Sequence, residues 1–290
     1  LIGRFDEKLT EGEDHKFVWQ AKALGVEIKE NTREIVTSAR KYEENSFWQT
    51  IKTLFKTATQ AKTFKQNSIK NIYCFFTKDP KSKNSKTRLR EVLKDNQLVD
   101  QFSLHCLAIL KENILDLDQG ENKIVIINNS PTRDYLYELG LDKYSILDIQ
   151  SDNIGQSMQE AYDICSPFGK NIVLTGSDIP ELKSSHLVKA VDELKQSDSY
   201  IIGTKDGGYC CFSTKLNNLG NAFTRVDYKS SQVMNDFIKH MYNIKKSDFE
   251  LIDVDTLDDL QNMYEALKQK NNKTEEQNNL IQFIDKRKYA

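Results

Sequence analysis

Acidic residues follow three apolar segments, and this placement is the clearest chemical signal in the chain. Asp178, Asp206 and the pair Asp253 and Asp255 each come soon after a short apolar run. Parallel strands end at the same edge of a sheet, where open α/β folds bind their ligands. Three such strand ends therefore predict one carboxylate cluster, able to hold Mg²⁺ or Mn²⁺ against a phosphate group.

Two of these acidic positions also have a purely structural interpretation. Asp206 lies in the sequence Lys-Asp-Gly-Gly, which is typical of the turn of a β-hairpin. Asp255 precedes Thr-Leu-Asp-Asp and suits the N-cap position of the following helix. A capping role for Asp255 does not exclude a metal-binding role for Asp253, so both interpretations stay open.

A basic loop at 77–89 follows the first apolar segment of the main domain. It contains Lys78, Lys86 and Arg88. Phosphate groups bind where cations and the N–H groups of a helix N-terminus converge. Lys86 and Arg88 fall in the first turn of the expected helix, where their charge opposes the helix dipole, and this placement indicates an anionic ligand. The alternative is a basic loop that is simply hydrated.

Apolar and polar segments alternate between residues 67 and 270, and this alternation predicts the fold. Strands and helices in such an order form an α/β domain with a doubly wound, mainly parallel sheet. The expected strands are 69–76, 123–128, 145–149, 171–175, 199–203 and 249–252, and the expected helices are 86–117, 131–139, 154–165, 183–196, 229–243 and 256–270.

The segments on either side of this domain differ from it in character. Residues 1–66 are expected to form a partial, mostly helical extension in which 46–65 is an amphipathic helix. Its apolar face is expected to pack on a neighbouring domain, with a membrane surface or a partner glycosyltransferase as alternatives. Residues 271–290 form a polar tail, expected to be mobile apart from a short docking turn.

Composition narrows the class of protein. Of the 290 residues, 38% are hydrophobic and 29% are charged, and the formal net charge is only -2, so no global attraction to nucleic acid is expected. The chain has no apolar run long enough to span a membrane. Its five cysteines lack the spacing of a metal site, which indicates buried free thiols in a reducing, cytoplasmic environment.

A series of short motifs resembles those of GT-A-like proteins assigned to the glycosyltransferases. That group is related to nucleotide-sugar transferases and to small nucleotidyltransferases such as the phospholactate guanylyltransferases. The resemblance extends over about two thirds of the chain. The motifs are Lys-x-Pro at 78–80, Lys-Thr-Arg-Leu at 86–89, Gln150 with Gly155 and Met158, Gly-Ser-Asp-Ile-Pro at 176–180, Asp-Gly-Gly-Tyr at 206–209 and Asp-Val-Asp-Thr at 253–256.

The resemblance implies specific roles for these residues. Asp178, Asp253 and Asp255 would hold Mg²⁺ or Mn²⁺, and Asp178 and Asp206 would take part in catalysis. The implied nucleotide-binding residues are Lys78, Lys86, Thr87, Arg88, Gln150, Gly155, Gly207, Gly208 and Tyr209. One departure stands out, because the family usually has Pro-Gly where this chain has Ser82 and Lys83. Glycine permits the backbone to approach a phosphate closely.

The N-terminal extension resembles a different group, the C-terminal end of an inverting glycosyltransferase of the family-two type. The resemblance rests on Gly-Arg-Phe-Asp-Glu at 3–7, Gly-Glu-Asp-His at 12–15 and Thr-Ser-Ala-Arg-Lys-Tyr at 37–42. It implies that Asp14 is the general base that deprotonates an acceptor hydroxyl. The nucleotide-binding half of such a domain is absent, so the chain is expected to be a fragment of a longer protein.

These observations give one main function and two alternatives. The main hypothesis is a metal-dependent glycosyl transfer from a nucleotide-sugar to an acceptor that the sequence does not identify. The first alternative is a nucleotidyltransferase that uses a nucleoside triphosphate and releases pyrophosphate. The second is a non-catalytic partner of another glycosyltransferase, which the missing loop glycine and the truncated extension favour.

Overall fold

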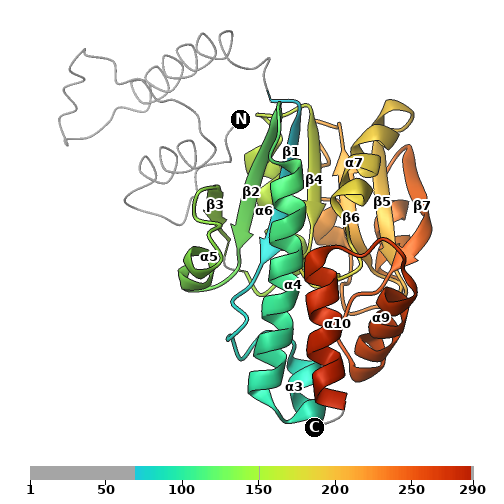
Figure 1. Ribbon diagram of the computed structural model, residues 1–290. Coiled ribbons are helices and arrows are strands. Elements are labelled where there is room, and N and C mark those ends of the chain that lie inside the picture. The colour runs from blue at the N-terminus through green and yellow to red at the C-terminus, as the bar shows by residue number, and fades with distance from the viewer. Residues whose placement is uncertain (1–68, 150, 289–290) are drawn as a thin grey trace, which may run out of the picture.

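The computed structural model describes residues 69–149 and 151–288, which form an α/β domain around one sheet of seven strands (Figure 1). The strands are β1 (Asn71–Thr77), β2 (Asn122–Asn128), β3 (Ser145–Asp148), β4 (Asn171–Thr175), β5 (Ser199–Thr204), β6 (Tyr209–Thr214) and β7 (Ile244–Leu251). Their order is β3-β2-β1-β4-β6-β5-β7, and only the pairs that include β6 are antiparallel. The predicted fold, an α/β domain with a mainly parallel sheet, is confirmed.

Helices connect most of these strands. They are α3 (Thr87–Leu93), α4 (Asn96–Leu117), α5 (Asp134–Glu138), α6 (Ile154–Cys165), α7 (Ser184–Asp192), α8 (Val233–Lys239), α9 (Leu257–Gln269) and α10 (Glu275–Lys288). Short 3₁₀ turns lie at Glu193–Lys195 and Phe223–Arg225. The predictions for residues 1–66, which include the helix at 46–65 and Asp14, lie outside the described residues, as does Gln150.

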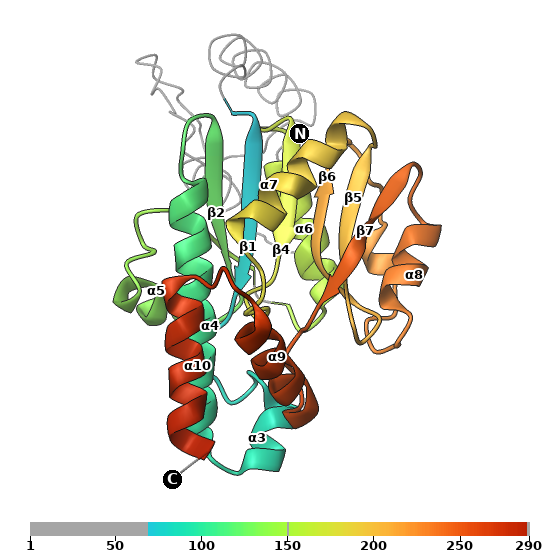
Figure 2. The ribbon, with the colours of Figure 1, turned by 45° about the vertical axis from the view of Figure 1, so that its right-hand side comes forward.

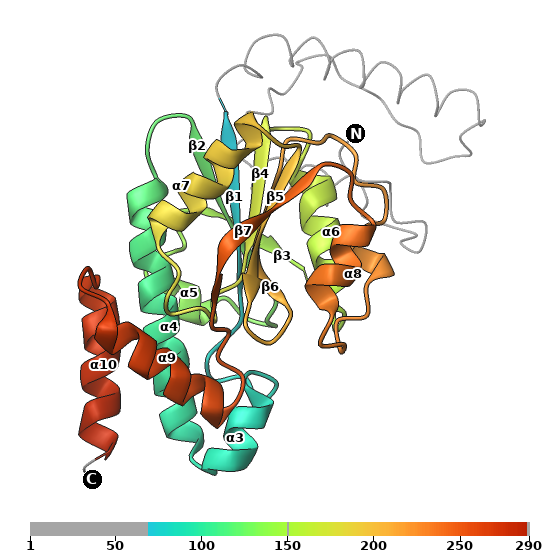
Figure 3. The same ribbon diagram turned by 90° about the vertical axis from the view of Figure 1, so that its right-hand side faces the viewer.

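The sheet is covered on both faces, with α4 and α7 on one side and α6 and α8 on the other (Figure 3). Neighbouring residues of β1 point to opposite faces, as the pleat requires. Phe75 therefore joins the core formed with α4 and α7, and Cys74 joins the core formed with α6 and α8. All five cysteines are buried and free of disulfides, as their distribution in the sequence predicts.

The sequence pattern did not reveal β6, which pairs in antiparallel fashion with both β4 and β5. A tight turn joins β5 to β6 as a hairpin, and Asp206 lies in that turn. The hairpin interpretation of Lys-Asp-Gly-Gly is therefore correct for the backbone. The alternation of strands and helices predicts that each strand is followed by a helix and then by a parallel strand. The hairpin of β5 and β6 has no helix between its strands, so this expectation does not include β6.

Two helical regions differ from expectation. The single helix expected at 86–117 is divided into α3 and α4, because Lys94 adopts a left-handed conformation (φ 52°) and Asp95 caps α4 by accepting a hydrogen bond from Leu98 N. The tail expected to be mobile from residue 271 instead contains α10, which lies beside α4 (Figure 2). Leu280 of α10 is fully buried in a third core formed with α3, α4 and α9.

Candidate active site at the carboxyl edge of the sheet

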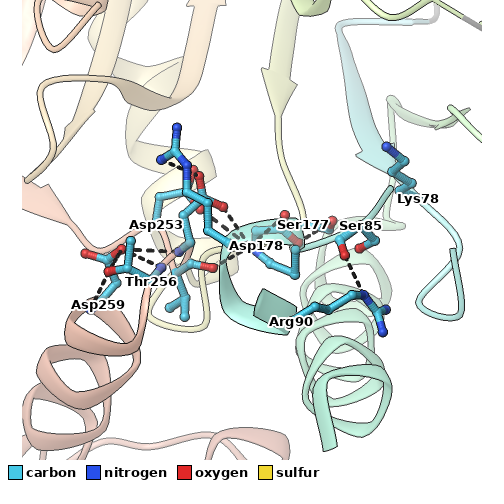
Figure 4. Close-up of polar contacts among 12 residues, drawn as sticks. Lys78, Ser85, Arg90, Ser177, Asp178, Asp253, Thr256 and Asp259 are labelled. Carbon is cyan, nitrogen blue, oxygen red and sulfur yellow. Dashed lines mark hydrogen bonds and ion pairs between the residues drawn. The ribbon is translucent and has the colours of Figure 1, made fainter. Parts of the chain in front are cut away.

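Three carboxylates and one ammonium group meet at the carboxyl edge of the sheet (Figure 4). Asp178 follows β4, while Asp253 and Asp255 follow β7, and Lys86 comes from the loop between β1 and α3. The strands β1, β4 and β7 run in the same direction, so their carboxyl ends lie along one edge. The structure thus brings together the three acidic residues that the sequence predicts as metal ligands.

The ammonium of Lys86 lies at the centre of this cluster. Its Nζ is 2.9 Å from Asp178 Oδ2, 3.5 Å from Asp255 Oδ1 and 3.8 Å from Asp253 Oδ1. It also donates a hydrogen bond of 2.6 Å to the carbonyl of Val254. Burial alone would lower the pKa of Lys86, but the three carboxylates together raise it above its ordinary value. Lys86 therefore stays charged inside the protein.

Lys86 thus occupies a different place from the one expected. The sequence predicts that it faces an anionic ligand at the start of a helix, whereas its side chain is only 1% exposed. The cause is local, because Lys86 is the N-cap of α3 in a left-handed conformation (φ 51°). In this structure its ammonium contacts carboxylates beneath the outer surface. Arg88, two residues further on, has a side chain that is 73% exposed, with Nη1 at 3.8 Å from Asp255 Oδ2.

Asp253 is the most perturbed carboxyl group of the cluster. Its pKa is raised to about 7, mainly because the group is buried. Lys86 opposes this rise, and the nearby carboxylates of Asp178, Asp255 and Asp206 add to it. Its Oδ1 is buried and accepts no hydrogen bond from the described residues. One ammonium does not neutralise three carboxylates, so the cluster keeps an excess of oxygen donors and of negative charge. Such a donor set fits Mg²⁺ or Mn²⁺, which prefer carboxylate oxygens.

Asp255 does not cap the following helix, so that structural interpretation is wrong. The N-cap of α9 is Thr256, whose Oγ1 accepts a hydrogen bond from Asp259 N at 3.2 Å. The carboxylate of Asp259 in turn accepts one from Thr256 N at 2.8 Å, which completes a capping box. The carboxylate of Asp255 is therefore available to the cluster.

A second set of buried contacts holds the strand ends together. Val254 N donates to the carbonyl of Asp178 at 3.3 Å, which joins the two acidic segments directly. Glu181, buried beside them, accepts a hydrogen bond of 3.0 Å from Ile252 N and pairs with Lys270 at 2.9 Å. These contacts fix the distance between the end of β4 and the end of β7.

Helix α10 contributes one further contact to this framework. Gln277, which is fully buried, donates from Nε2 to the carbonyl of Pro180 at 2.8 Å and accepts a hydrogen bond from Thr274 N at 3.1 Å. Neither Glu181 nor Gln277 is among the site residues predicted from the sequence. Glu181 directly follows the Gly-Ser-Asp-Ile-Pro motif, which is a usable signal, but Gln277 lies in a polar stretch that gives none.

The basic loop between β1 and α3 is held by contacts within itself. Arg90, also missed in the sequence, donates to the carbonyls of Ser85 and Pro80, each at 2.7 Å, and pairs with Asp100. Lys78 donates to the carbonyl of Asn84 at 2.9 Å. Thr87 is exposed. Lys78 and Arg88 are therefore the predicted phosphate-binding cations that remain accessible at this loop, with the exposed Thr87 between Lys86 and Arg88.

The glycines predicted to lie against a substrate instead lie close to other parts of the protein chain. A Cβ atom on Gly155 would lie 2.5 Å from the carbonyl oxygen of Phe223. One on Gly207, which has φ +91°, would lie 1.9 Å from the carbonyl oxygen of Ser231. Gly208 donates its N–H to Asp206 Oδ1 at 3.1 Å within the hairpin turn. These positions have structural reasons to be glycine, and their roles toward a nucleotide stay predictions.

Asp206 and Tyr209 also have partners inside the domain. Asp206 Oδ1 accepts a hydrogen bond of 2.5 Å from Thr204 Oγ1, in addition to the one from Gly208. The hydroxyl of Tyr209 lies 3.1 Å from that of Tyr228, on the face of the sheet covered by α6 and α8. Both side chains therefore have structural partners, and the catalytic role of Asp206 stays a prediction.

Two negative findings apply to residues 69–149 and 151–288. Among these described residues, no group of three or more Asp, Glu, His or Cys side chains has the arrangement of a formed metal site. Within the same residues, no helix is both long and apolar enough to cross a membrane.

Known proteins resemble this chain in sequence and in fold. Residues 113–230 match the family described as "Uncharacterized protein conserved in bacteria (DUF2064)". The chain is 27% identical over 182 residues to 2-phospho-L-lactate guanylyltransferase of Methanobrevibacter smithii, a match that covers 62% of this chain and 78% of that protein. A crystal structure of a candidate nucleotide-diphospho-sugar transferase from Desulfovibrio desulfuricans G20 matches with a TM-score of 0.62 and 21% identity, covering 76% of this chain and 96% of the other.

Proposed function

Residues 113–230 match the DUF2064 family, and the described domain has the nucleotide-diphospho-sugar transferase fold. From this premise we propose that the protein is a metal-dependent nucleotidyltransferase. One observation carries the proposal: Asp178, Asp253 and Asp255 converge at the carboxyl edge of the sheet, next to a basic loop. This is the edge at which open α/β sheets bind their ligands. The similarity to a guanylyltransferase favours nucleotidyl over glycosyl transfer, the main hypothesis from sequence.

Each group at this edge suits one part of the reaction. Asp178, Asp253 and Asp255 would hold Mg²⁺ or Mn²⁺, which lowers the cost of negative charge that develops on the phosphate oxygens. Lys78 and Arg88 would neutralise the phosphates of the donor from the loop side. An acceptor oxygen would attack the α-phosphorus, a new P–O bond would form, and the bond to pyrophosphate would break.

The acceptor is expected to carry a negative charge. An acceptor whose attacking oxygen is already ionised, such as a phosphate monoester, needs no general base. The name of the similar 2-phospho-L-lactate guanylyltransferase gives a small phosphorylated acid of this kind. We therefore propose a small anionic acceptor.

The experiment compares the products of two donor classes. The purified chain is incubated with Mn²⁺, 2-phospho-L-lactate as the anionic acceptor and each of the four ribonucleoside triphosphates in turn, and pyrophosphate is measured. A parallel series uses nucleotide-sugars and measures the nucleoside diphosphate. Asp178→Asn is the control in both series.

The three outcomes separate the hypotheses. Pyrophosphate that depends on Asp178 supports nucleotidyl transfer. A nucleoside diphosphate product would replace the proposal with glycosyl transfer. If nucleotides bind to the chain in calorimetry but no product forms in either series, the protein is a non-catalytic partner with a retained nucleotide site.

A further inference from the structure

The place that a metal ion would take in the carboxylate cluster already holds a cation. Lys86 Nζ lies within 4 Å of oxygens from Asp178, Asp253 and Asp255, and its side chain is 1% exposed. The left-handed conformation of Lys86 and the hydrogen bond to the Val254 carbonyl direct the side chain inward. The backbone conformation and this hydrogen bond therefore fix the position of the ammonium in the cluster.

A divalent cation would need the same oxygens. Metal–oxygen distances of about 2.0–2.6 Å put the ion among the oxygens that Lys86 contacts, so the two positive charges would lie close together. Like charges a few ångströms apart in a partly buried site repel strongly. Three carboxylates attract a divalent cation, but the resident ammonium cancels part of that attraction in the free protein.

We propose that Lys86 is the resident counter-cation of the carboxylate cluster, so that the free protein binds a divalent cation weakly and gains it together with the nucleotide phosphates. The part that concerns the nucleotide rests on the proposed function. Phosphate oxygens add ligands and negative charge on the open side of the cluster, where Asp178 and Asp255 are about half exposed. That added negative charge offsets the repulsion between the metal ion and Lys86. Lys86 is thus a positioning residue that orders the three carboxylates and delays metal binding.

The test uses Mn²⁺ alone, because its binding is measured by electron paramagnetic resonance without any turnover. Lys86→Met keeps a long unbranched side chain and removes the charge. Loss of one positive charge about 4 Å from the metal position should tighten Mn²⁺ binding at least about tenfold. Arg88→Met, the matched control, removes an exposed charge beside Asp255 and should change the affinity much less, because water screens that charge. Equal or weaker Mn²⁺ binding by folded Lys86→Met would overturn the proposal.

A second pair of variants keeps the test decisive if Lys86→Met does not fold. Removal of one buried charge leaves its partners uncompensated, so Asp253→Asn is compared with and without Lys86→Met. The double variant should bind Mn²⁺ more tightly than Asp253→Asn alone, and the reverse order would also overturn the proposal. Nucleotide binding by the wild type is measured separately. If Lys86→Met binds Mn²⁺ tightly but the wild type binds no nucleotide, the nucleotidyltransferase proposal is refuted. The proposed role of Lys86 as counter-cation would still hold in that case.

Discussion

The two sides of the candidate site are held in place by different means. On the carboxylate side, the segments that carry Asp178 and Asp253 are tied together by contacts between residues distant in sequence. These are Glu181 with Ile252 and Lys270, and Gln277 with Pro180. On the loop side, Arg90 and Lys78 bond to carbonyls within ten residues of themselves. The carboxylate side therefore depends on the whole domain down to its last helix, whereas the loop side can adjust to a ligand at little cost elsewhere.

The largest expected effect is on the carboxylate side. Asp178→Asn and Asp253→Asn each remove a negative charge at the proposed metal position, and turnover should fall on the order of 10²–10³-fold. Asp206→Asn is the comparison, because Asp206 also follows a strand of this edge but accepts hydrogen bonds within its own hairpin turn. Its effect on pyrophosphate release should be much smaller. If all three variants were equally impaired, Asp206 would belong to the catalytic group as the sequence resemblance implies.

The next prediction tests the dependence on helix α10. Gln277→Leu leaves the Pro180 carbonyl without its buried donor and should weaken Mn²⁺ affinity in the presence of nucleotide by about 10–100-fold, the usual effect of losing a group that orients ligands. Leu280→Ala is the matched control on the same helix. It should destabilise the protein by about 2–5 kcal/mol through the cavity it leaves.

The test compares the Mn²⁺ affinities of Gln277→Leu and Leu280→Ala. Both are measured by calorimetry at a temperature at which circular dichroism shows them folded. Equal losses of Mn²⁺ affinity would mean that α10 supports the site only through general stability. A loss confined to Gln277→Leu would show that the side chain of Gln277 positions the Asp178 loop.

The two sides also differ in how far the sequence could predict them. The acidic ends of β4 and β7 are visible as apolar runs that stop at Asp, and their convergence follows from the parallel sheet. The orientation of Lys86 was not predictable, because it depends on a left-handed backbone at one non-glycine residue. The contribution of Gln277 was hidden for another reason, because the polar sequence around α10 resembles a mobile tail. The apolar residues that anchor α10 to the core, Leu280, Ile281, Phe283 and Ile284, form one short patch after Gln277.

On the loop side, smaller and more local effects are expected. Lys78→Ala and Arg88→Ala should each weaken nucleotide affinity by about 1–2 kcal/mol, since both are accessible cations that lose a charge-assisted contact to phosphate. The loss should shrink as the salt concentration rises, because exposed charges are screened. Lys83→Ala, an exposed lysine of the same loop, is the control. An effect of Lys83→Ala as large as the others would mean that the loop attracts nucleotide only through its general charge.

The smallest expected effect is on the pH dependence of folding stability, and it also differs between the two sides of the site. Burial, together with the nearby cations Lys270, Lys183 and Lys189, lowers the pKa of His186 to about 4. Its ring also lies against Phe249, and its Nδ1 accepts a hydrogen bond from Lys183 N, so it sits beside the Glu181–Lys270 pair of the carboxylate side. The unfolded chain binds this proton near pH 6.5 and the folded protein only near pH 4. Stability should therefore fall as pH falls through this window.

His186→Asn keeps an acceptor for Lys183 N but has no titrating group, which isolates the contribution of the imidazole. Between pH 6 and pH 5, urea unfolding of the wild type should lose about 1 kcal/mol more than that of the variant, because one pKa unit corresponds to 1.36 kcal/mol and the shift spans this interval. Hydrogen exchange should show the added opening at Ile252 N, whose acceptor is Glu181, and not at Ser85 in the basic loop. Equal losses in both proteins would mean that His186 titrates near its ordinary pKa in the folded state, and equal exchange at both amides would mean that the two sides open as one unit.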